Sequence, residues 1–506
     1  MSIGKVILVG AGPGDEGLLT IKGKRWLERA DVVIYDHLAN SQLIRFAKSE
    51  AELIYVGKKS GSFVLSQEQI NKLLIEKAQE GKIVVRLKGG DPFIFGRGGE
   101  EVQELSNAKI PFFIVPGVTS PVGVSAYAGI PLTHRDRAST ISIVTGSVGN
   151  SPDSLPIDWE ELAKWPGTLV FLMGARKLKS IAENLIRYGK KPETPIAVIQ
   201  WGTLPKQKTW TSVLGDIVVT IENQTIKPPA LTIVGDVVEL KDTLDWYEKL
   251  PLFGKNIVIT RPEEQSEGFR ELLLEQGASP ISFPVIKTFP PESWDLLDTA
   301  INQLDSYHGL IFTSVNGVRY FIERLHFLDK DIRELKGVRL YAIGPKTEQA
   351  VRDLGIKVDV VPENYVAESL IESIGKEPLN GKRFLLPRAT VARETLPNEL
   401  RKSGAEIDVA PAYQTLPPKK VDPEILEKIK AGEIDVITFT ASSTVDNFMN
   451  LIGKDSLSAL KNVVIACIGP ITAKTAEKHG LTPTVIPEKY TVDSLVLALE
   501  NYYSPK

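Results

Sequence analysis

The sequence predicts an α/β protein built of several domains, and three observations lead to that prediction. The chain has 506 residues, which exceeds one ordinary domain and favours about three units that each bury a core. Short β-branched apolar runs alternate with helix-like stretches along its length, as in α/β folds. The region after Gly254 repeats itself, which indicates two related lobes.

Composition restricts the classes of function. Hydrophobic residues make up 42% of the chain and charged residues 24%, with a formal net charge of −3. This balance argues against a general nucleic-acid or membrane binder, so an anionic substrate would need local basic clusters. No apolar run reaches the ~18 residues of a membrane span, and the N-terminus enters a strand without a signal peptide. We therefore expect a cytoplasmic protein that acts on small molecules.

Cysteine and histidine usage argues against disulfides and metal sites. Cys467 is the only cysteine, and it lies in an apolar run where a small core residue is expected. A single cysteine excludes an internal disulfide and fits a reducing compartment. The five histidines are scattered without metal-ligand spacing, so no metal is expected.

The chain opens with a strand over Lys5–Val9, followed by the glycine-rich turn Gly10–Asp15. The turn looks like a dinucleotide-binding fingerprint but departs from it, because Asp15 stands where the last glycine of G-x-G-x-x-G is required. Pro13 also makes the turn stiffer than a usual phosphate cradle. The alternative is a strand-to-helix turn of no special function.

The segment Val85–Glu101 is the most informative part of the chain. A β-branched run ends there in basic residues and a Gly-Gly-Asp turn, after which a helix is expected from Glu100. Ligands of open α/β sheets bind outside the carboxyl ends of the strands. Gly89 and Gly90 let a ligand approach the main chain because they carry no Cβ atom. The plain alternative is a tight turn without a ligand.

Further polar residues follow other expected strands of the first half. Asp36 follows the strand Val32–Tyr35, and Lys58 follows the strand Leu53–Val56. Either residue alone could be a solvated turn residue. Together with Asp91, they predict a crevice rim that carries acid, base and cation at the carboxyl ends of the strands.

A domain boundary is expected near Asp245–Gly254, a stretch of aromatic residues and proline. Beyond it, Gly254–Pro262 matches Gly381–Ala389, and Phe283–Pro291 matches Ala410–Pro418 at the same spacing along the chain. Further matched pairs keep a glycine or a proline in register. Two copies are too few for a solenoid, so we expect a two-lobed α/β domain with a ligand cleft between its lobes.

The first half resembles the tetrapyrrole methylase family, and within it the uroporphyrinogen-III C-methyltransferases, from about Lys5 to Trp246. One departure is His37, because relatives often carry arginine after the Tyr-Asp pair. The resemblance rests on Val9–Asp15, Tyr35–Asp36, Val56–Lys58, Arg86–Glu100, Val115–Gly117, Gly129–Arg135 and Pro229–Ala230.

This resemblance implies S-adenosylmethionine as a methyl donor bound between two α/β lobes, with S-adenosylhomocysteine as the product. The proton-handling residues of the family fall on Asp36 and Lys58. Residues that hold the acceptor fall on Arg97, Glu100 and Arg135, and arginine forks suit a polycarboxylate. The residues implied to contact the cofactor are Pro13, Gly89, Gly90, Asp91, Ile94, Thr119, Ser120, Met173, Gly202 and Ala230.

The second half carries hydroxyl groups at the ends of its expected strands rather than a nucleophile–base–acid constellation. As helix N-caps, these hydroxyls would only close helix ends. As ligands, they would donate hydrogen bonds to a polycarboxylate between the lobes. Arg261 and Arg388 occupy matching places in the two copies of the repeat. The hydroxyl residues taken as substrate-binding candidates are Thr313, Ser314, Thr347, Ser443 and Thr472.

This half resembles the uroporphyrinogen-III synthase family over about Gly254 to Leu499. The family fold has two lobes joined by a two-stranded link, and the resemblance implies a proton-donating role for Tyr413. The linear substrate, hydroxymethylbilane, loses water readily, so positioning matters more than strong acids. The supporting motifs are Ile259–Pro262, Phe312–Ser314, Ile343–Pro345, Tyr413–Thr415 and Ile468–Pro470 with Thr472.

Together, the two resemblances predict a bifunctional enzyme. A methylase domain is expected over residues 1–246, a linker over 247–253, and a synthase domain over 254–506. Within the synthase, lobe one would take about 254–285 and 418–506, and lobe two about 286–417. The second half would make uroporphyrinogen III, and the first half would methylate it twice to precorrin-2, for sirohaem or cobalamin.

The expected partners are tetrapyrrole substrates, without nucleic acid or membrane, and the family implies a homodimer through the methylase domain. The fusion supports the assignment because the product of one activity is the substrate of the other. The alternative is a corrinoid methylase with a C-terminal domain that senses a tetrapyrrole without catalysis.

Overall fold

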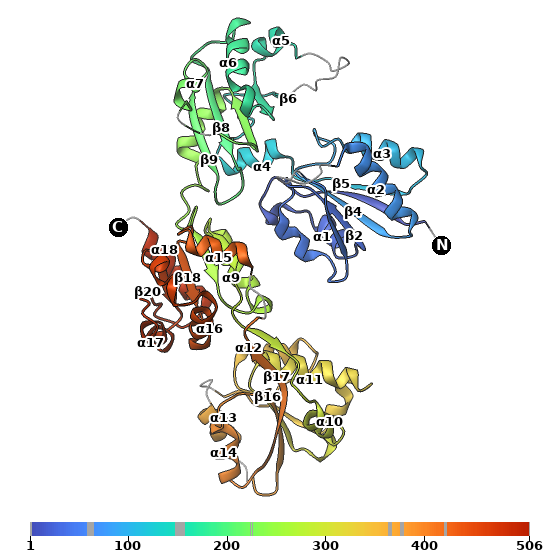
Figure 1. Ribbon diagram of the computed structural model, residues 1–506, viewed down its shortest axis with the longest axis vertical. Coiled ribbons are helices and arrows are strands. Elements are labelled where there is room, and N and C mark those ends of the chain that lie inside the picture. Colours follow the sequence, from blue (N-terminus) through green and yellow to red (C-terminus); the bar gives the residue numbers. More distant parts are fainter. Residues whose placement is uncertain are drawn as a thin grey trace. The chain divides into compact units, whose positions relative to one another are not determined.

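The computed structural model describes residues 3–57, 65–146, 157–222, 224, 226–362, 367–374, 379–418 and 422–504. The chain divides into two compact units. The first unit comprises Met1–Asn256, Leu272–Ser279 and Glu500–Lys506, and the second comprises Ile257–Glu271 and Pro280–Leu499. Helices and strands alternate through both units (Figure 1), which confirms the predicted α/β class.

The first sheet of the first unit has five parallel strands in the order β3-β2-β4-β1-β5. Its central strands are almost continuously apolar because helices cover both faces. Parallel pairing brings the carboxyl ends of β1 and β4 together at one edge. The strands are β1 (Lys5–Gly10), β2 (Val32–Tyr35), β3 (Glu52–Tyr55), β4 (Ile83–Lys88) and β5 (Phe112–Val115).

Alternate residues of these strands pack against different helices, since successive side chains point to opposite faces. On one face, Val6 and Leu8 pack in a cluster with Leu74 of α2 (Gln67–Gln79) and Leu105 of α3 (Gly98–Asn107). On the other face, Ile7 and Val9 pack with Leu27 of α1 (Ile21–Leu27). The sheet therefore lies between two layers of helices (Figure 1).

The second sheet of the first unit is mixed, with the order β6-β7-β10-β8-β9. Helix α4 (Ser120–Tyr127) packs on one face through Val124, and α6 (Leu178–Arg187) packs on the other through Ile181 and Leu185. Helices α5 (Trp159–Lys164), α7 (Ile217–Thr220) and α8 (Lys241–Leu244) complete this lobe. The strands are β6 (Ile141–Thr145), β7 (Thr168–Leu172), β8 (Pro195–Gln200), β9 (Lys208–Val213) and β10 (Ala230–Val234).

The second unit also has two five-stranded sheets, ordered β12-β11-β18-β19-β20 and β13-β17-β16-β14-β15. The strands of the first of these are β11 (Asn256–Ile259), β12 (Ser279–Ser282), β18 (Val436–Phe439), β19 (Val464–Cys467) and β20 (Pro483–Val485). Those of the other are β13 (Lys287–Phe289), β14 (Gly309–Phe312), β15 (Arg339–Ala342), β16 (Arg383–Ala389) and β17 (Glu406–Leu416).

The two copies of the repeat exchange strands between these sheets. Strand β11 of the first copy pairs with β18 of the second copy, and β16 of the second copy pairs with β14 of the first. Strand β13 also pairs antiparallel with the end of the 11-residue strand β17. Each sheet therefore contains strands from both copies.

Helices cover both sheets of the second unit. The helices are α9 (Glu267–Glu275), α10 (Asp295–Ile301), α11 (Val315–Phe327), α12 (Pro345–Arg352), α13 (Ala367–Ile374), α14 (Thr395–Lys402), α15 (Pro423–Lys430), α16 (Ser442–Ile452), α17 (Pro470–Lys478) and α18 (Val492–Tyr503). Four of these helices, α11, α12, α16 and α17, begin three residues after a strand ends, so the loops at these strand ends are short.

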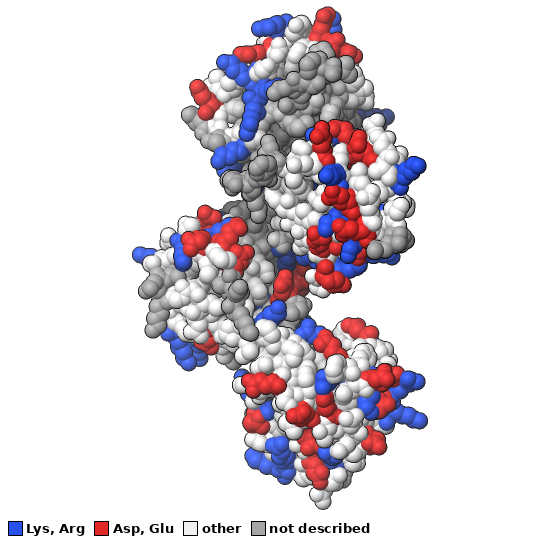
Figure 2. Space-filling view, turned by 45° about the vertical axis from the view of Figure 1, so that its right-hand side comes forward, with Lys and Arg blue, Asp and Glu red and all other residues white. Residues whose placement is uncertain are grey.

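Two expectations on composition can be compared with the structure. Cys467 is fully buried in β19, which confirms its place as a core residue. Within the described ranges, no helix is long and apolar enough to cross a membrane. Figure 2 shows Lys and Arg interspersed with Asp and Glu over the visible face, in line with the small net charge.

Candidate functional site

Glycine-containing turns meet at the carboxyl ends of β1, β4 and β5. Gly12 and Gly90 exchange backbone hydrogen bonds in both directions, with N···O distances of 3.2 and 2.7 Å. A Cβ atom on Gly117 would lie 2.3 Å from the carbonyl oxygen of Gly90, so no larger residue fits there. Gly90 itself has a φ of +66°, which favours glycine. The three turns therefore form a tight backbone rim.

Asp91 joins two of these turns. One carboxylate oxygen accepts a hydrogen bond from the Gly117 N–H at 3.0 Å, and the other accepts from the Phe93 N–H at 2.8 Å. Thr119 and Ser120, at the start of α4, lie beside the same rim. A Cβ atom built on Gly90 would be 3.6 Å from the Ser120 nitrogen. The structure thus brings these four predicted cofactor contacts together.

A second group of predicted cofactor contacts meets across the two lobes of the first unit. The backbone N–H of Asp15 donates to Thr203 Oγ1 at 3.0 Å, and the Tyr127 hydroxyl donates to Asp15 Oδ2 at 2.6 Å. A Cβ atom on Gly123 would lie 2.6 Å from the ring of Pro13. The turn that carries Pro13 therefore lies against the turn that carries Gly202 and against α4.

Several loop residues of the first unit have an unusual backbone conformation. Positive φ angles occur at Phe95 (52°), Arg97 (58°), Met173 (55°), Trp201 (55°) and Thr203 (67°). Such a conformation costs a non-glycine residue about 1–3 kcal/mol, and it clusters at functional sites. These residues lie in the loops that carry the predicted cofactor and acceptor contacts.

Exposed apolar side chains accompany this strain. Met173 is 54% exposed and Ile94 is 42% exposed, although both follow strands at the predicted rim. Ala230 is half-buried at the start of β10, beside the end of β8. Exposed apolar groups beside backbone donors and acceptors are the combination that an adenosyl cofactor needs.

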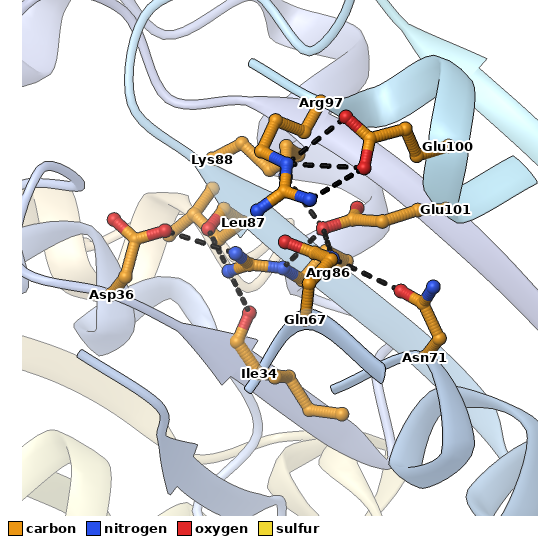
Figure 3. Close-up of polar contacts among 10 residues, drawn as sticks. All are labelled: Ile34, Asp36, Gln67, Asn71, Arg86, Leu87, Lys88, Arg97, Glu100 and Glu101. Carbon is orange, nitrogen blue, oxygen red and sulfur yellow. Dashed lines mark hydrogen bonds and ion pairs between the residues drawn. The ribbon is translucent and has the colours of Figure 1, made fainter. Parts of the chain in front are cut away.

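A buried cluster of charges lies beneath the rim (Figure 3). Arg86 of β4 is 3% exposed, and its Nη2 donates to Asp36 Oδ2 at 2.9 Å. Lys88 Nζ donates to Glu101 Oε1 at 2.7 Å, and Arg86 Nε lies 3.5 Å from the same oxygen. Gln67 of α2 donates to that oxygen as well, at 3.1 Å. The fully buried carboxylate of Glu101 therefore binds two cations at once.

The cluster is not fully satisfied. Arg86 Nε and Glu101 Oε2 have no hydrogen-bond partner within the described part of the chain. Burial, followed by repulsion from Arg86, lowers the pKa of Lys88. Desolvation offsets much of the Coulomb attraction in a buried ion pair, so such a pair adds little net stability. In this cluster its effect is to fix the orientation of the side chains it contacts, Asp36 among them.

Asp36 is the part of this cluster that reaches the rim. It follows β2 and is half-buried, and its second oxygen accepts a hydrogen bond from the Leu38 N–H at 3.0 Å. The ion pair with Arg86 holds one oxygen, so the carboxylate has a fixed orientation. Lys58, predicted as its partner in proton transfer, lies outside the described residues.

The predicted acceptor-binding residues are on the surface. Arg97 donates to Glu100 from both Nε and Nη2, at 3.0 and 2.6 Å. This pairing raises the pKa of Arg97 and lowers the pKa of Glu100. Arg135 is exposed in the loop after α4. Arg97 and Glu100 are therefore joined by an exposed ion pair, which contributes little to stability.

In the second unit, buried Tyr413 contacts half-buried Ser314. Tyr413 is 8% exposed, and its hydroxyl lies 3.0 Å from Ser314 Oγ. Ser314 also accepts from the Gly317 N–H at 3.0 Å, so it caps α11 as well as binding Tyr413. The Tyr413 ring stacks on Tyr320 at 5.6 Å. The capping and ligand-binding interpretations of Ser314 are therefore compatible.

The remaining hydroxyls fall into two groups. Thr313 and Thr347 follow the neighbouring strands β14 and β15 in the sheet that also carries Tyr413. Ser443 and Thr472 follow the neighbouring strands β18 and β19 in the other sheet. Thr347 and Thr472 are buried, whereas Ser443 is exposed. Each sheet thus has two of these hydroxyl residues after its strands, and one of the two is buried.

Three residues of the buried charge cluster, Arg86, Lys88 and Glu101, were not assigned to the site from the sequence. Glu101 occupies an ordinary helix position, where a lone glutamate predicts a solvated face. The available signal is Arg86 and Lys88, two cations inside an otherwise apolar strand, because buried cations require a partner. Arg388, 7% exposed, gives the same signal in β16, where it is paired with Glu394.

Known proteins resemble this chain along its whole length. Residues 5–218 match the family described as Tetrapyrrole (Corrin/Porphyrin) Methylases, and residues 267–497 match Uroporphyrinogen-III synthase HemD. The "Porphyrin biosynthesis protein HemD" of Ruminiclostridium josui is 38% identical over 98% of this chain and 97% of its own. The chain belongs to the family of tetrapyrrole methylases fused to a uroporphyrinogen-III synthase.

Two further similar proteins are named as methyltransferases. The "Uroporphyrinogen-III C-methyltransferase" of Bacillus subtilis is 40% identical over 70% of this chain and 72% of its own. The "S-adenosyl-L-methionine-dependent uroporphyrinogen III methyltransferase" of Methanosarcina barkeri is 48% identical over 48% of this chain and 94% of its own. Both family resemblances identified from sequence motifs are therefore confirmed.

Proposed function

We propose that the second half of this protein converts hydroxymethylbilane to uroporphyrinogen III, and that the first half methylates this product twice to precorrin-2. The observation that carries the proposal is the full-length similarity to a fused relative, with each half matching a family of the same pathway. The proposed domains are a methylase over residues 1–246, a joining segment over 247–253 and a synthase over 254–506. Their products and substrates follow one another.

The methylase site fits S-adenosylmethionine as donor. The backbone rim at Gly90 and Asp91 would bind the polar parts of the cofactor, and the exposed side chains of Ile94 and Met173 would cover its apolar parts. Bound there, the cofactor supplies an electrophilic methyl group on its sulfonium. The remaining proposed contacts are Pro13, Gly89, Thr119, Ser120, Gly202 and Ala230.

Asp36 is proposed to accept the proton that the methylated pyrrole must lose. Its carboxylate is held by Arg86, so one oxygen has a fixed direction at the rim. Lys58 is proposed to donate or return a proton at the same ring. Arg97 and Arg135 are proposed to bind acceptor carboxylates, with Glu100 releasing Arg97 when the substrate arrives.

Tyr413 is proposed to act in the synthase. Its hydroxyl, in contact with Ser314, would donate a proton to the hydroxyl group that leaves hydroxymethylbilane. The carbon–oxygen bond then breaks with loss of water. A carbon of the terminal pyrrole bonds to the freed methylene carbon, and the proton that this pyrrole loses would return to the Tyr413 oxygen. The hydroxyls of Thr313, Thr347, Ser443 and Thr472 would bind substrate carboxylates and hold the chain folded for inversion of one pyrrole. Positioning is the main requirement for this reactive substrate.

Three further properties are proposed from the family. The protein would work in the cytoplasm, as a homodimer formed through the methylase domain. Its product would feed sirohaem or cobalamin synthesis. Sedimentation of the purified chain measures the oligomeric state, and a monomer at micromolar concentration would contradict the dimer.

The decisive experiment is a coupled assay on the full-length chain. Hydroxymethylbilane and labelled S-adenosylmethionine are supplied together, and the products are separated by isomer and by label. We expect labelled precorrin-2. Only the uninverted isomer, as formed without enzyme, would contradict the synthase and would support a sensing domain. Uroporphyrinogen III without label would contradict the methylase and would direct the search to later corrinoid acceptors.

A further inference from the structure

The segment that leads from the methylase to the synthase packs back onto the methylase site. This joining segment, residues 247–253, contacts the turn Trp201–Gln207, which carries Gly202. Tyr247 of this segment is 4% exposed, and its hydroxyl donates to the Thr203 carbonyl oxygen at 3.3 Å. The Tyr247 ring also meets the ring of Tyr127 edge-on at 4.7 Å. The joining segment is therefore part of the wall of the first unit.

Glu248 reaches the same turn through Gln207. One oxygen of Glu248 accepts from Gln207 Nε2 at 2.9 Å and from Thr209 Oγ1 at 2.5 Å. Its other oxygen lies 3.4 Å from Lys241 Nζ. Gln207 is 3% exposed, and its side-chain oxygen accepts from the Thr203 N–H at 2.8 Å. A relay of hydrogen bonds thus connects Glu248 to the backbone of Thr203.

Thr203 needs this support because of its conformation. It is buried, and its φ of +67° is unfavourable for a β-branched residue. Its N–H is bound by Gln207, its carbonyl by Tyr247 and its hydroxyl by the Asp15 N–H. Two of these three contacts depend on the joining segment. Strained residues persist only when their surroundings over-determine them, as here.

The position of Thr203 determines the position of two groups beside the donor. Gly202 directly precedes Thr203 in the chain. The hydroxyl of Thr203 accepts a hydrogen bond from the N–H of Asp15, which belongs to the turn that carries Pro13. A Cβ atom on Gly14 would lie 2.8 Å from Thr203 Oγ1, so the two turns are in close contact. A change in Thr203 would therefore displace both turns.

We propose that Tyr247 and Glu248 are positioning residues for methyl transfer. They hold the Trp201–Gln207 turn, and through Thr203 the turn that carries Pro13, in the shape that binds S-adenosylmethionine. The inference rests on the proposed methylase function of the first unit. The segment that connects the two activities is then also a support of the donor site.

The test uses the full-length chain and measures the Kd of S-adenosylhomocysteine by calorimetry, with kcat and KM for S-adenosylmethionine. Glu248→Ala should raise both Kd and KM about tenfold, because Gln207 loses its buried acceptor. Glu248→Gln should restore most of the affinity, because an amide oxygen can accept the same two hydrogen bonds. Tyr247→Phe keeps the packed ring and should raise Kd about threefold. Lys249→Ala, an exposed change in the same segment, should match the wild type.

The outcomes separate the positioning role from general stability and from the methylase assignment. Wild-type Kd in both Glu248→Ala and Tyr247→Phe would overturn the proposal, and Tyr247→Phe decides if Glu248→Ala does not fold. A Glu248→Gln variant as weak as Glu248→Ala would also overturn the hydrogen-bond relay. If the wild-type chain itself binds no S-adenosylhomocysteine, the methylase function fails, whereas unchanged variants of a binding chain overturn only the positioning role.

Discussion

The two candidate sites of this protein differ in the kinds of residue that form them. The methylase site combines tight glycine turns, loop residues at positive φ and a buried cluster of two cations and two carboxylates. The synthase site has rows of hydroxyls and the Ser314–Tyr413 pair at strand ends. Methyl transfer between two bound molecules needs a fixed geometry and a held base. Folding one reactive chain into a ring needs many weak contacts, so the hydroxyl rows suffice.

The largest effect is expected at the base. Asp36→Asn should lower kcat of methylation by about 10²–10⁴-fold, because an amide cannot take a proton in the transition state. Affinity for S-adenosylhomocysteine should stay within about twofold, and the synthase rate should not change. Asp31→Asn at the other end of β2 is the matched control. Loss of activity below tenfold would remove Asp36 from the base role.

The next effect concerns stability of the methylase unit. Glu101→Ala leaves Lys88 buried without a carboxylate and leaves Arg86 with Asp36 alone, so it should lower the free energy of unfolding by about 3–5 kcal/mol. Glu100→Ala, one residue away, breaks an exposed pair and should cost about 0–1 kcal/mol. Denaturant unfolding, followed by the fluorescence of the methylase tryptophans, compares them. Equal losses would show that the buried cluster is energetically unimportant.

A smaller effect is expected in the synthase. Tyr413→Phe removes the hydroxyl but keeps the ring on Tyr320, and it should slow cyclisation about tenfold or more through loss of the proton donor. Ser314→Ala should slow it less and cost about 1 kcal/mol in stability, because α11 loses its cap. Stopped assays of uroporphyrinogen III read the rate. An unchanged rate in Tyr413→Phe would contradict the proton-donor role of Tyr413, and the synthase would then act by positioning its substrate alone.

The smallest effect is a pH dependence. A hydrogen bond from the Ile83 N–H, together with Lys48, lowers the pKa of Asp31 below 3.8 in the folded state. A lowered folded pKa stabilises the fold above about pH 3.8, and this contribution is lost as pH falls through the folded value. Asp31→Asn should therefore flatten the acid limb of methylase stability. Thermal melting between pH 5 and about pH 2 measures this, and identical curves would contradict it.

The strands and the turns beside them could be predicted from the sequence. The expected strands at Lys5–Val9 and Val32–Tyr35 correspond to β1 and β2, because β-branched runs bounded by turn residues have few alternatives. Arg86 and Lys88 in an apolar strand indicate that a carboxylate must lie nearby, but not that Glu101 supplies it, since that depends on which helix covers the strand. The positive φ of Thr203 could not be predicted from the sequence either, because tertiary contacts rather than local preference impose it.

The pairing of β11 with β18 has a consequence for how the protein is made. Strand β11 (Asn256–Ile259) lies between β12 and β18, and β18 begins at residue 436, so β11 leaves the ribosome long before this second partner is synthesised. The methylase residues are complete by then and can fold as chain growth continues, since domains fold N-terminal first. Both synthase lobes share strands from distant parts of the chain, and such non-local pairing is slow. We therefore expect the chain to be most prone to aggregation while its synthase half is being synthesised and has not yet paired these strands.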